Sequence, residues 1–166
     1  MGKPILFVCT LGEETPIASL HGNGEFIYRA AIGYDDQTQC VFSALVIFAP
    51  LPGFGDGTGY ELVFRIVEAP ADGSAPRDYH DGLETKRFIS EPDDRRDIID
   101  VVTFMICGHI DAVRPAAVEM MTHTENLPVS ALRKFHQIAA EFGKRGYKAG
   151  PADPWHGRWV WMMRLP

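Results

Sequence analysis

Four ionisable side chains in this sequence have the types needed for acid–base or metal chemistry: His80, Asp81, His109 and His156. His80 and Asp81 are adjacent in the longest polar stretch, residues 70–84, and such loops often carry function. A histidine beside a carboxylate can act as a general base or a metal ligand. One hypothesis is therefore a small enzyme, a hydrolase or transferase. It would require the fold to draw at least two of these residues into one pocket.

Cys107, His109 and Asp111 form a second cluster, with one residue between successive members. Such spacing converges only on a strand, and we interpret this segment as a helix or its end. The C-terminus of a helix favours a cation, which gives His109 a structural explanation. His80 has no second histidine at helical or strand spacing, as a metal site would require. We therefore expect no cofactor and no bound metal.

The C-terminal block combines positive charge with aromatic side chains. Residues 128–166 hold seven Lys and Arg against two Asp and Glu, a net charge of +5, whereas residues 1–127 hold nine against twenty, a net of −11. Trp159 and Trp161 share one face of an expected strand and are assigned to the core. Trp155 and His156 precede that strand and are expected to be exposed.

Exposed indoles anchor protein partners or stack on nucleic-acid bases, and basic side chains around them add electrostatic attraction. Arg133 and Lys134 lie on the polar side of an expected helix in the same block. We therefore predict a binding surface made of Trp155, His156, Arg158, Arg133 and Lys134. Its ligand would be another protein or a second copy of the chain, and single-stranded nucleic acid is the alternative.

Two short motifs resemble low-molecular-weight tyrosine phosphatases. The run Ile5–Thr10 is similar to the opening of that family, and Asp153-Pro154-Trp155 is similar to its general-acid motif. Phosphatase chemistry needs an Arg six residues after the cysteine, to bind phosphate and to lower the thiol pKa. This sequence has Thr15 there, preceded by Glu13 and Glu14, so we exclude that activity.

The first half of the sequence predicts β-structure. Alternating or continuous apolar runs bounded by turn residues are typical of strands, and short connections between them favour a meander. A polar loop follows over residues 70–84, and a short strand is expected over residues 86–89. The four main strands are expected at Ile5–Thr10, Glu25–Tyr34, Cys40–Ala49 and Tyr60–Ala69.

In the second half of the sequence, the spacing of the apolar residues changes. Ser90 to Asp93 resembles a capping box before a helix, although β-branched residues leave both helix and strand open for residues 94–107. A strand over residues 118–123, a helix from Pro128 and a strand over residues 158–165 follow. We predict an α+β fold: an antiparallel sheet of five to six strands, a β-meander then α-β-α-β, with two helices packed on one face.

Composition limits the class of protein. The 166 residues fit a single domain, 1–166, and the net charge of −6 argues against coating DNA or an anionic membrane. Three widely spaced cysteines and no signal-peptide or membrane-spanning run predict a cytoplasmic protein with no membrane partner. Our main hypothesis is a non-enzymatic binding or regulatory module of the inhibitor, immunity or counter-defence type, which acts through protein–protein contacts.

Overall fold

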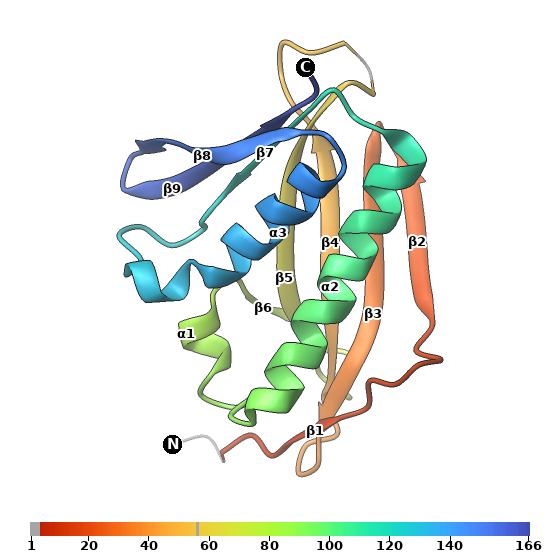
Figure 1. Cartoon of the computed structure of the whole chain (residues 1–166). Coiled ribbons are helices and arrows are strands. Elements are labelled where there is room, and N and C mark those ends of the chain that lie inside the picture. The colour runs from red at the N-terminus through yellow and green to blue at the C-terminus, as the bar shows by residue number, and fades with distance from the viewer. Residues whose placement is uncertain (1–3, 56) are drawn as a thin grey trace.

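The computed structural model describes residues 4–55 and 57–166, which form one mixed sheet with helices on one side (Figure 1). The strand order is β1-β3-β4-β5-β7-β9-β8, with β2 also paired to β3 and β6 to β5. Within the described residues, all strand pairs are antiparallel except β5 with β7. The strands are β1 (Phe7–Cys9), β2 (Ile17–Gly22), β3 (Glu25–Asp35), β4 (Val41–Pro50), β5 (Gly59–Ala69), β6 (Arg77–Tyr79), β7 (Ala117–Met121), β8 (Lys148–Trp155) and β9 (Arg158–Arg164).

The segment that could have been helix or strand is the long helix α2 (Pro92–Val113). Proline at the first position suits a helix start, and acidic residues in the first turn interact favourably with the helix dipole. Arg114 ends the helix in a left-handed conformation with φ of 53°. Six side chains at helical spacing face the sheet and are buried: Ile98, Val102, Met105, Ile106, His109 and Ile110.

Helix α3 (Arg133–Lys144) follows a single 3-10 turn, η1 (Val129–Ala131), and packs beside α2 on the same face. Its apolar stripe is buried, and the ring of Phe135 stacks on Trp161 at a centroid distance of 4.8 Å. Trp161 and Met163 are fully buried. The last strand was expected to place alternate residues in the core, and this expectation is correct for Trp161 and Met163.

The predicted sheet of five to six antiparallel strands is wrong, although the α+β class is right. The sheet has nine strands, and β5 and β7 run parallel. The strands not predicted are β2, β6 and β8. β2 is almost wholly exposed, β6 has three residues, and β8 contains Pro151 and Pro154. All three lack the apolar alternation that identifies a half-buried strand.

Two local predictions in the connection to α2 are also wrong. The expected strand at residues 86–89 is instead the turn after the short helix α1 (Gly82–Thr85), and it buries Phe88 and Ile89. The N-cap of α2 is Glu91, whose side chain makes no capping hydrogen bond, so Ser90 does not form the expected capping box. The chain enters the helix through Pro92, which already lacks an amide hydrogen.

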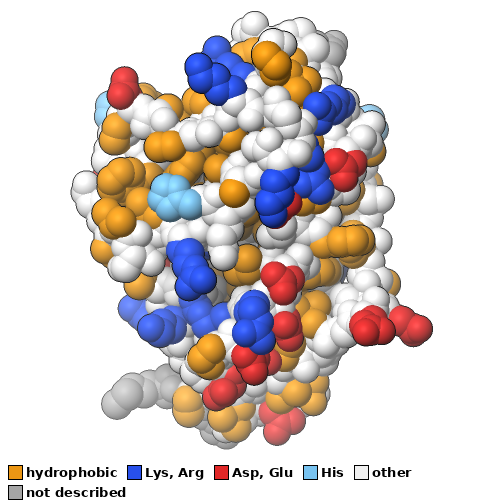
Figure 2. All heavy atoms as spheres, viewed as in Figure 1, with side chains coloured by type: hydrophobic (Ala, Val, Ile, Leu, Met, Phe, Trp, Pro, Cys, Tyr) orange, Lys and Arg blue, Asp and Glu red, His pale blue; other side chains and the backbone are white. Residues whose placement is uncertain are grey.

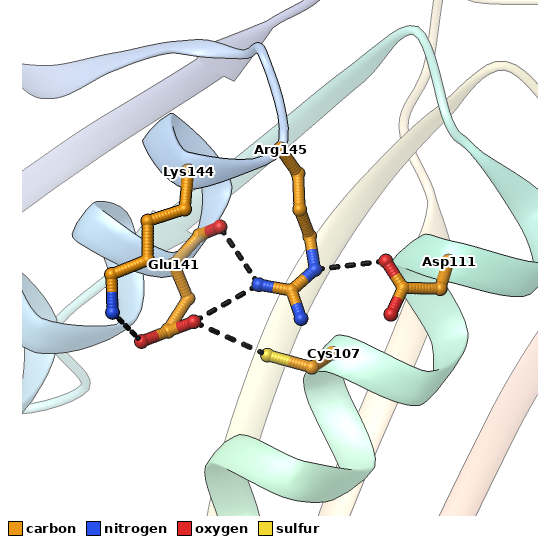
Figure 3. Close-up of polar contacts among 5 residues, drawn as sticks. All are labelled: Cys107, Asp111, Glu141, Lys144 and Arg145. Atoms are coloured by element: carbon orange, nitrogen blue, oxygen red, sulfur yellow. Dashed lines mark hydrogen bonds and ion pairs between the residues drawn. The ribbon is translucent and has the colours of Figure 1, made fainter.

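A polar cluster joins the C-terminal halves of α2 and α3 (Figure 3). Arg145 donates to Asp111 at 2.8 Å and to Glu141 at 2.9 Å, and Lys144 donates to the other oxygen of Glu141 at 2.6 Å. The Cys107 thiol lies 3.9 Å from Glu141, and burial raises the pKa of that thiol. A protonated thiol is a poor nucleophile, so this cluster serves to hold the two helices together.

Candidate binding site at a fork in the sheet

The parallel pair opens a gap in the sheet. β5 pairs with β7 only over residues 59–62, and it pairs with β6 only over residues 66–68. Because β4 occupies the whole opposite edge of β5, β6 and β7 must share the remaining edge. Val63, Phe64 and Arg65 lie between them without a strand partner on that side. We call this gap the fork. In open sheets with parallel strands, ligands bind beyond the carboxyl ends of such strands.

A cavity of about 120 Å³ lies at the fork. Its apolar part includes Leu62 and Phe64, which face the helices from β5, and Phe135 of α3. Its polar part comes from five residues of the strands and of the loops that follow them: Glu61, His80, Thr122, His123 and Arg158. At roughly 30 Å³ per water molecule, the cavity has room for about four waters. That is smaller than the roughly 300 Å³ or more of a typical cofactor pocket.

Two histidines form one wall of this cavity. The rings of His80 and His123 stack with centroids 3.8 Å apart and planes 15° from parallel. Burial lowers the pKa of His80, and the neighbouring His123 and Arg65 lower it further. His80 is therefore neutral at physiological pH. No spacing in the sequence links His123 to His80, because 43 positions separate the two residues and only the fold joins them.

Asp81 has a structural role at the edge of the fork. One of its carboxylate oxygens accepts hydrogen bonds from the amides of Leu83 and Glu84, both at 2.9 Å, and the other accepts from the Thr124 hydroxyl at 2.9 Å. Burial alone would raise the pKa of Asp81, but these hydrogen bonds outweigh it and hold the pKa below its usual range. The carboxylate caps α1 and fastens it to the loop after β7.

Two arginines near the fork, on β5 and β9, have guanidinium N–H groups for which the described residues provide no hydrogen-bond acceptor. Arg158 lies 4.0 Å from Glu125, and Arg65 lies 3.8 Å from Asp78, so both ion pairs are long. The Nε atoms of both arginines are buried and have no hydrogen-bond partner among the described residues. Buried polar groups are nearly always paired, so an unpaired guanidinium nitrogen beside a cavity indicates a missing acceptor.

The helix side of the fork is closed by Lys134. Its ammonium lies 5.3 Å from the ring centroids of both Phe64 and Phe135, in the geometry of a cation–π contact. Burial lowers the pKa of Lys134 to about 8, although Asp81 opposes that shift. On this side of the molecule, Lys and Arg gather over α1 and the start of α3, and Asp and Glu gather over the first half of α2 (Figure 2).

The five residues predicted to bind a partner lie on two sides of the sheet. His156 and Gly157 have φ of 47° and 77° and form the two-residue turn of the β8–β9 hairpin. Trp155 and Arg158 are cross-strand partners beside this turn, so both project away from the helices. Trp155 is 54% exposed. Arg133 and Lys134 begin α3, so they lie on the helix side.

His109 is remote from the fork. It is buried under α2, where its ring stacks on Phe48 at 3.9 Å and its Nδ1 lies 2.7 Å from the Tyr28 hydroxyl. Burial lowers the pKa of His109 to about 4, so it is neutral and is not the cation expected at a helix end. Of the four residues proposed for catalysis, His80 lines the cavity, and Asp81, its neighbour in the chain, lies beside the cavity without lining it. His109 and His156 lie elsewhere.

The face of the sheet opposite the helices carries a row of apolar side chains. The register pairs Leu20 with Ile27, Ile27 with Ile47, and Ile47 with Val63, and cross-strand partners share a face. Leu20 is 67% exposed, Ile27 and Val63 are half-buried, and Ile47 between them is only 9% exposed. We call this surface the helix-free face, because the described helices lie on the other side (Figure 1). The row ends at Val63, which lines the fork cavity.

Comparison with known proteins gives no further guide: no family model, curated protein or solved structure matches the chain. Within residues 4–55 and 57–166, no group of three or more His, Cys, Asp or Glu is arranged to hold a metal ion. No helix in the same part of the chain is long and apolar enough to cross a membrane.

Proposed function

We propose that this protein is a non-enzymatic binding module that contacts another protein through the helix-free face. The observation that carries the proposal is the apolar row Leu20, Ile27, Ile47 and Val63. An antiparallel sheet with one open face normally presents polar side chains to water on that face. A contiguous apolar patch on a surface instead marks an interaction site.

Trp155 extends this surface at its far end. It projects to the same side as Arg158 and is more than half exposed, although tryptophan is among the most buried side chains on average. Tryptophan and arginine are the residue types that most often dominate binding energy at protein interfaces. The indole of Trp155 and the guanidinium of Arg158 therefore extend the apolar row into a surface to which a partner protein can bind.

Binding is favoured over catalysis by how the ionisable groups are used. The carboxylate of Asp81 already accepts three hydrogen bonds, so it is not available to orient His80 as a general base. His109 is buried beneath α2, away from the cavity. The cavity itself has room for a small group rather than for a substrate of ordinary size.

The test compares two apolar positions of equal exposure on opposite sides of the sheet. Leu20 on the helix-free face and Phe104 on α2 are both 67% exposed. Proteins cross-linked to the wild type in cells of its source would be identified and quantified, together with its self-association by sedimentation. Leu20→Glu should reduce recovery of the specific partner by about tenfold or more, and Phe104→Glu should leave it unchanged.

The same experiment can refute the proposal. Equal losses for Leu20→Glu and Phe104→Glu would show that the helix-free face has no special part in binding. Unchanged recovery in Leu20→Glu and in the double variant Leu20→Glu with Trp155→Ala would exclude this face as the contact surface. Thermal melting of each variant would verify that the fold is intact, because Leu20 and Trp155 are exposed and contribute little to the core.

A further inference from the structure

The fork contains hydrogen-bond donors that the protein itself does not use. Arg158 lines the cavity, its Nε is buried and has no hydrogen-bond partner in the described part of the chain, and the carboxylate of Glu125 is 4.0 Å away. A guanidinium presents five N–H donors in a fixed planar arrangement that matches carboxylate and phosphate oxygens. The geometry therefore leaves room at Arg158 for an acceptor from outside the chain.

The remaining polar groups of the cavity are compatible with such an acceptor. His80 and His123 each add ring nitrogens that donate a hydrogen bond in at least one tautomer or charge state. The Thr122 hydroxyl accepts from the amide of Trp159 and keeps its own hydrogen free to donate. Glu61 is the one carboxylate that lines the cavity. Its negative charge would repel an anion, so removal of that charge should tighten the binding of an oxyanion.

We propose that the fork cavity is a binding site for an oxyanion, either a carboxylate or a phosphate group, held by Arg158 and the stacked pair of His80 and His123. The volume of about 120 Å³ fits a group of this size and not a larger cofactor. The fork lies beyond the carboxyl end of β7, and sheets with parallel strands place their ligands beyond such ends. This site does not depend on a protein partner at the helix-free face.

Occupation of the site should depend on pH. Arg65 and His123 oppose protonation of His80, whereas Asp78 and Glu84 favour it. An oxyanion would add a negative charge beside the His80 ring and would favour its protonated form. Affinity for acetate, whose own charge does not change in this range, should therefore rise as the pH falls from 7.5 to 6.0, and the bound oxyanion should raise the pKa of His80.

The experiment is an NMR titration of the wild-type protein, with ¹³C-labelled histidine, by sodium phosphate and separately by sodium acetate. Chloride would keep the ionic strength constant, and each titration would be run at pH 6.0 and 7.5. We expect saturable shifts of the His80 and His123 ring signals, with tighter binding of acetate at pH 6.0. Saturation by phosphate alone would identify a tetrahedral ligand, and saturation by acetate alone a carboxylate.

Two arginines of β9 provide a matched pair of variants. Arg158 and Arg164 lie at the two ends of β9 and project to the same face, but only Arg158 lines the cavity. Arg158→Gln should weaken binding by about tenfold or more, because a charge-assisted hydrogen bond is lost. Arg164→Gln should leave the affinity unchanged. Glu61→Gln should tighten binding, and His123→Phe, which keeps a stacked ring, should reduce its pH dependence.

Three results would overturn the proposal. The first is that neither anion gives saturable shifts at either pH. The second is that Arg158→Gln and Arg164→Gln weaken binding equally, which would indicate a general effect of net charge. The third is that Glu61→Gln abolishes binding, since the loss of a negative charge cannot weaken a site that holds phosphate or acetate through Arg158 and the histidines. If Arg158→Gln does not fold, the tighter binding expected for Glu61→Gln and the smaller pH dependence expected for His123→Phe still decide the question.

Discussion

His109 should make the protein lose stability as the pH falls toward 4, and replacement of this histidine should remove that loss. The ring is 1% exposed and lies among Phe26, Phe48 and Tyr60. Its Nδ1 is 2.7 Å from the Tyr28 hydroxyl, whereas its Nε2 is buried without a partner among the described residues. Protonation would place an ionised imidazolium in this apolar site, which is costly.

The size of this loss of stability follows from the pKa values of His109 in the folded and unfolded states. Burial lowers the pKa of His109 from 6.5 to about 4, so between these values the unfolded chain binds a proton that the folded protein does not. The contribution of His109 to the free energy of unfolding is therefore fully present above pH 6.5, and it decreases as the pH falls from 6.5 towards 4. At about 1.4 kcal/mol per pKa unit, the loss approaches 3 kcal/mol by pH 4. That is a large share of the roughly 5–15 kcal/mol that stabilises a typical domain.

The assay is urea unfolding followed by tryptophan fluorescence at pH 7, 6, 5 and 4. His109→Phe keeps an aromatic ring in the site and should show a shallower decrease between pH 6.5 and 4.5 than the wild type. The control is His156→Asn, an exposed histidine at φ 47°, a conformation that Asn adopts readily. Identical pH profiles for the wild type and His109→Phe would refute the reasoning, since His80 would then have to account for the whole decrease.

Three further substitutions test local features by urea unfolding. Asp81→Ala should cost about 1–2 kcal/mol at pH 7 because α1 loses its N-cap, and the difference from the wild type should shrink below pH 4, where the wild-type carboxylate becomes protonated. Arg145→Ala removes the ion pairs between α2 and α3 and should cost up to about 1 kcal/mol, whereas Arg96→Ala, in an exposed pair, should cost almost nothing. Gly33→Ala would place a Cβ 2.3 Å from a carbonyl oxygen of β1 and should cost about 1–3 kcal/mol, whereas Gly12→Ala meets nothing within 4 Å and should be neutral.

The strands and helices with strong periodicity could be predicted from the sequence. β3, β4, β5 and β9 lie within a residue or two of their expected positions, because each has apolar residues on at least one face. The choice between helix and strand for residues 94–107 could not be made locally, because Ile98, Val101 and Val102 favour strands by propensity. Packing of one helical face on the sheet decides it in favour of α2.

The missed strands are stabilised by their neighbours rather than by their own residues. β8 contains Pro151 and Pro154, which cannot donate to a ladder and which normally argue against a strand. It pairs only with β9, at the end of the sheet order, where one side of the strand needs no partner. The tight turn at His156 and Gly157 fixes this pairing, so the strand depends on a hairpin rather than on an apolar pattern.

The candidate site was predicted only in part, for a related reason. Arg158, Lys134, His80 and Asp81 were identified by residue type, and all four lie in or next to the fork. His123 was missed because its partner, His80, is brought to it by the path of the chain through α2. The sequence pattern predicted an antiparallel sheet throughout, and such a sheet would have contained no fork.

The fork itself follows from the lengths of the elements. The chain leaves β5, passes through β6, α1 and α2, and returns beside β5 in the same direction as β7. β7 has only five residues, and β5 has eleven, so β7 covers one end of the shared edge and β6 covers part of the other. Val63, Phe64 and Arg65 have no strand partner on that edge within the described residues, and side chains from five separate segments line the cavity there: 61–64, 80, 121–123, 135 and 158. A longer β7 would close this gap, so the shortness of one strand creates the place where a ligand can bind.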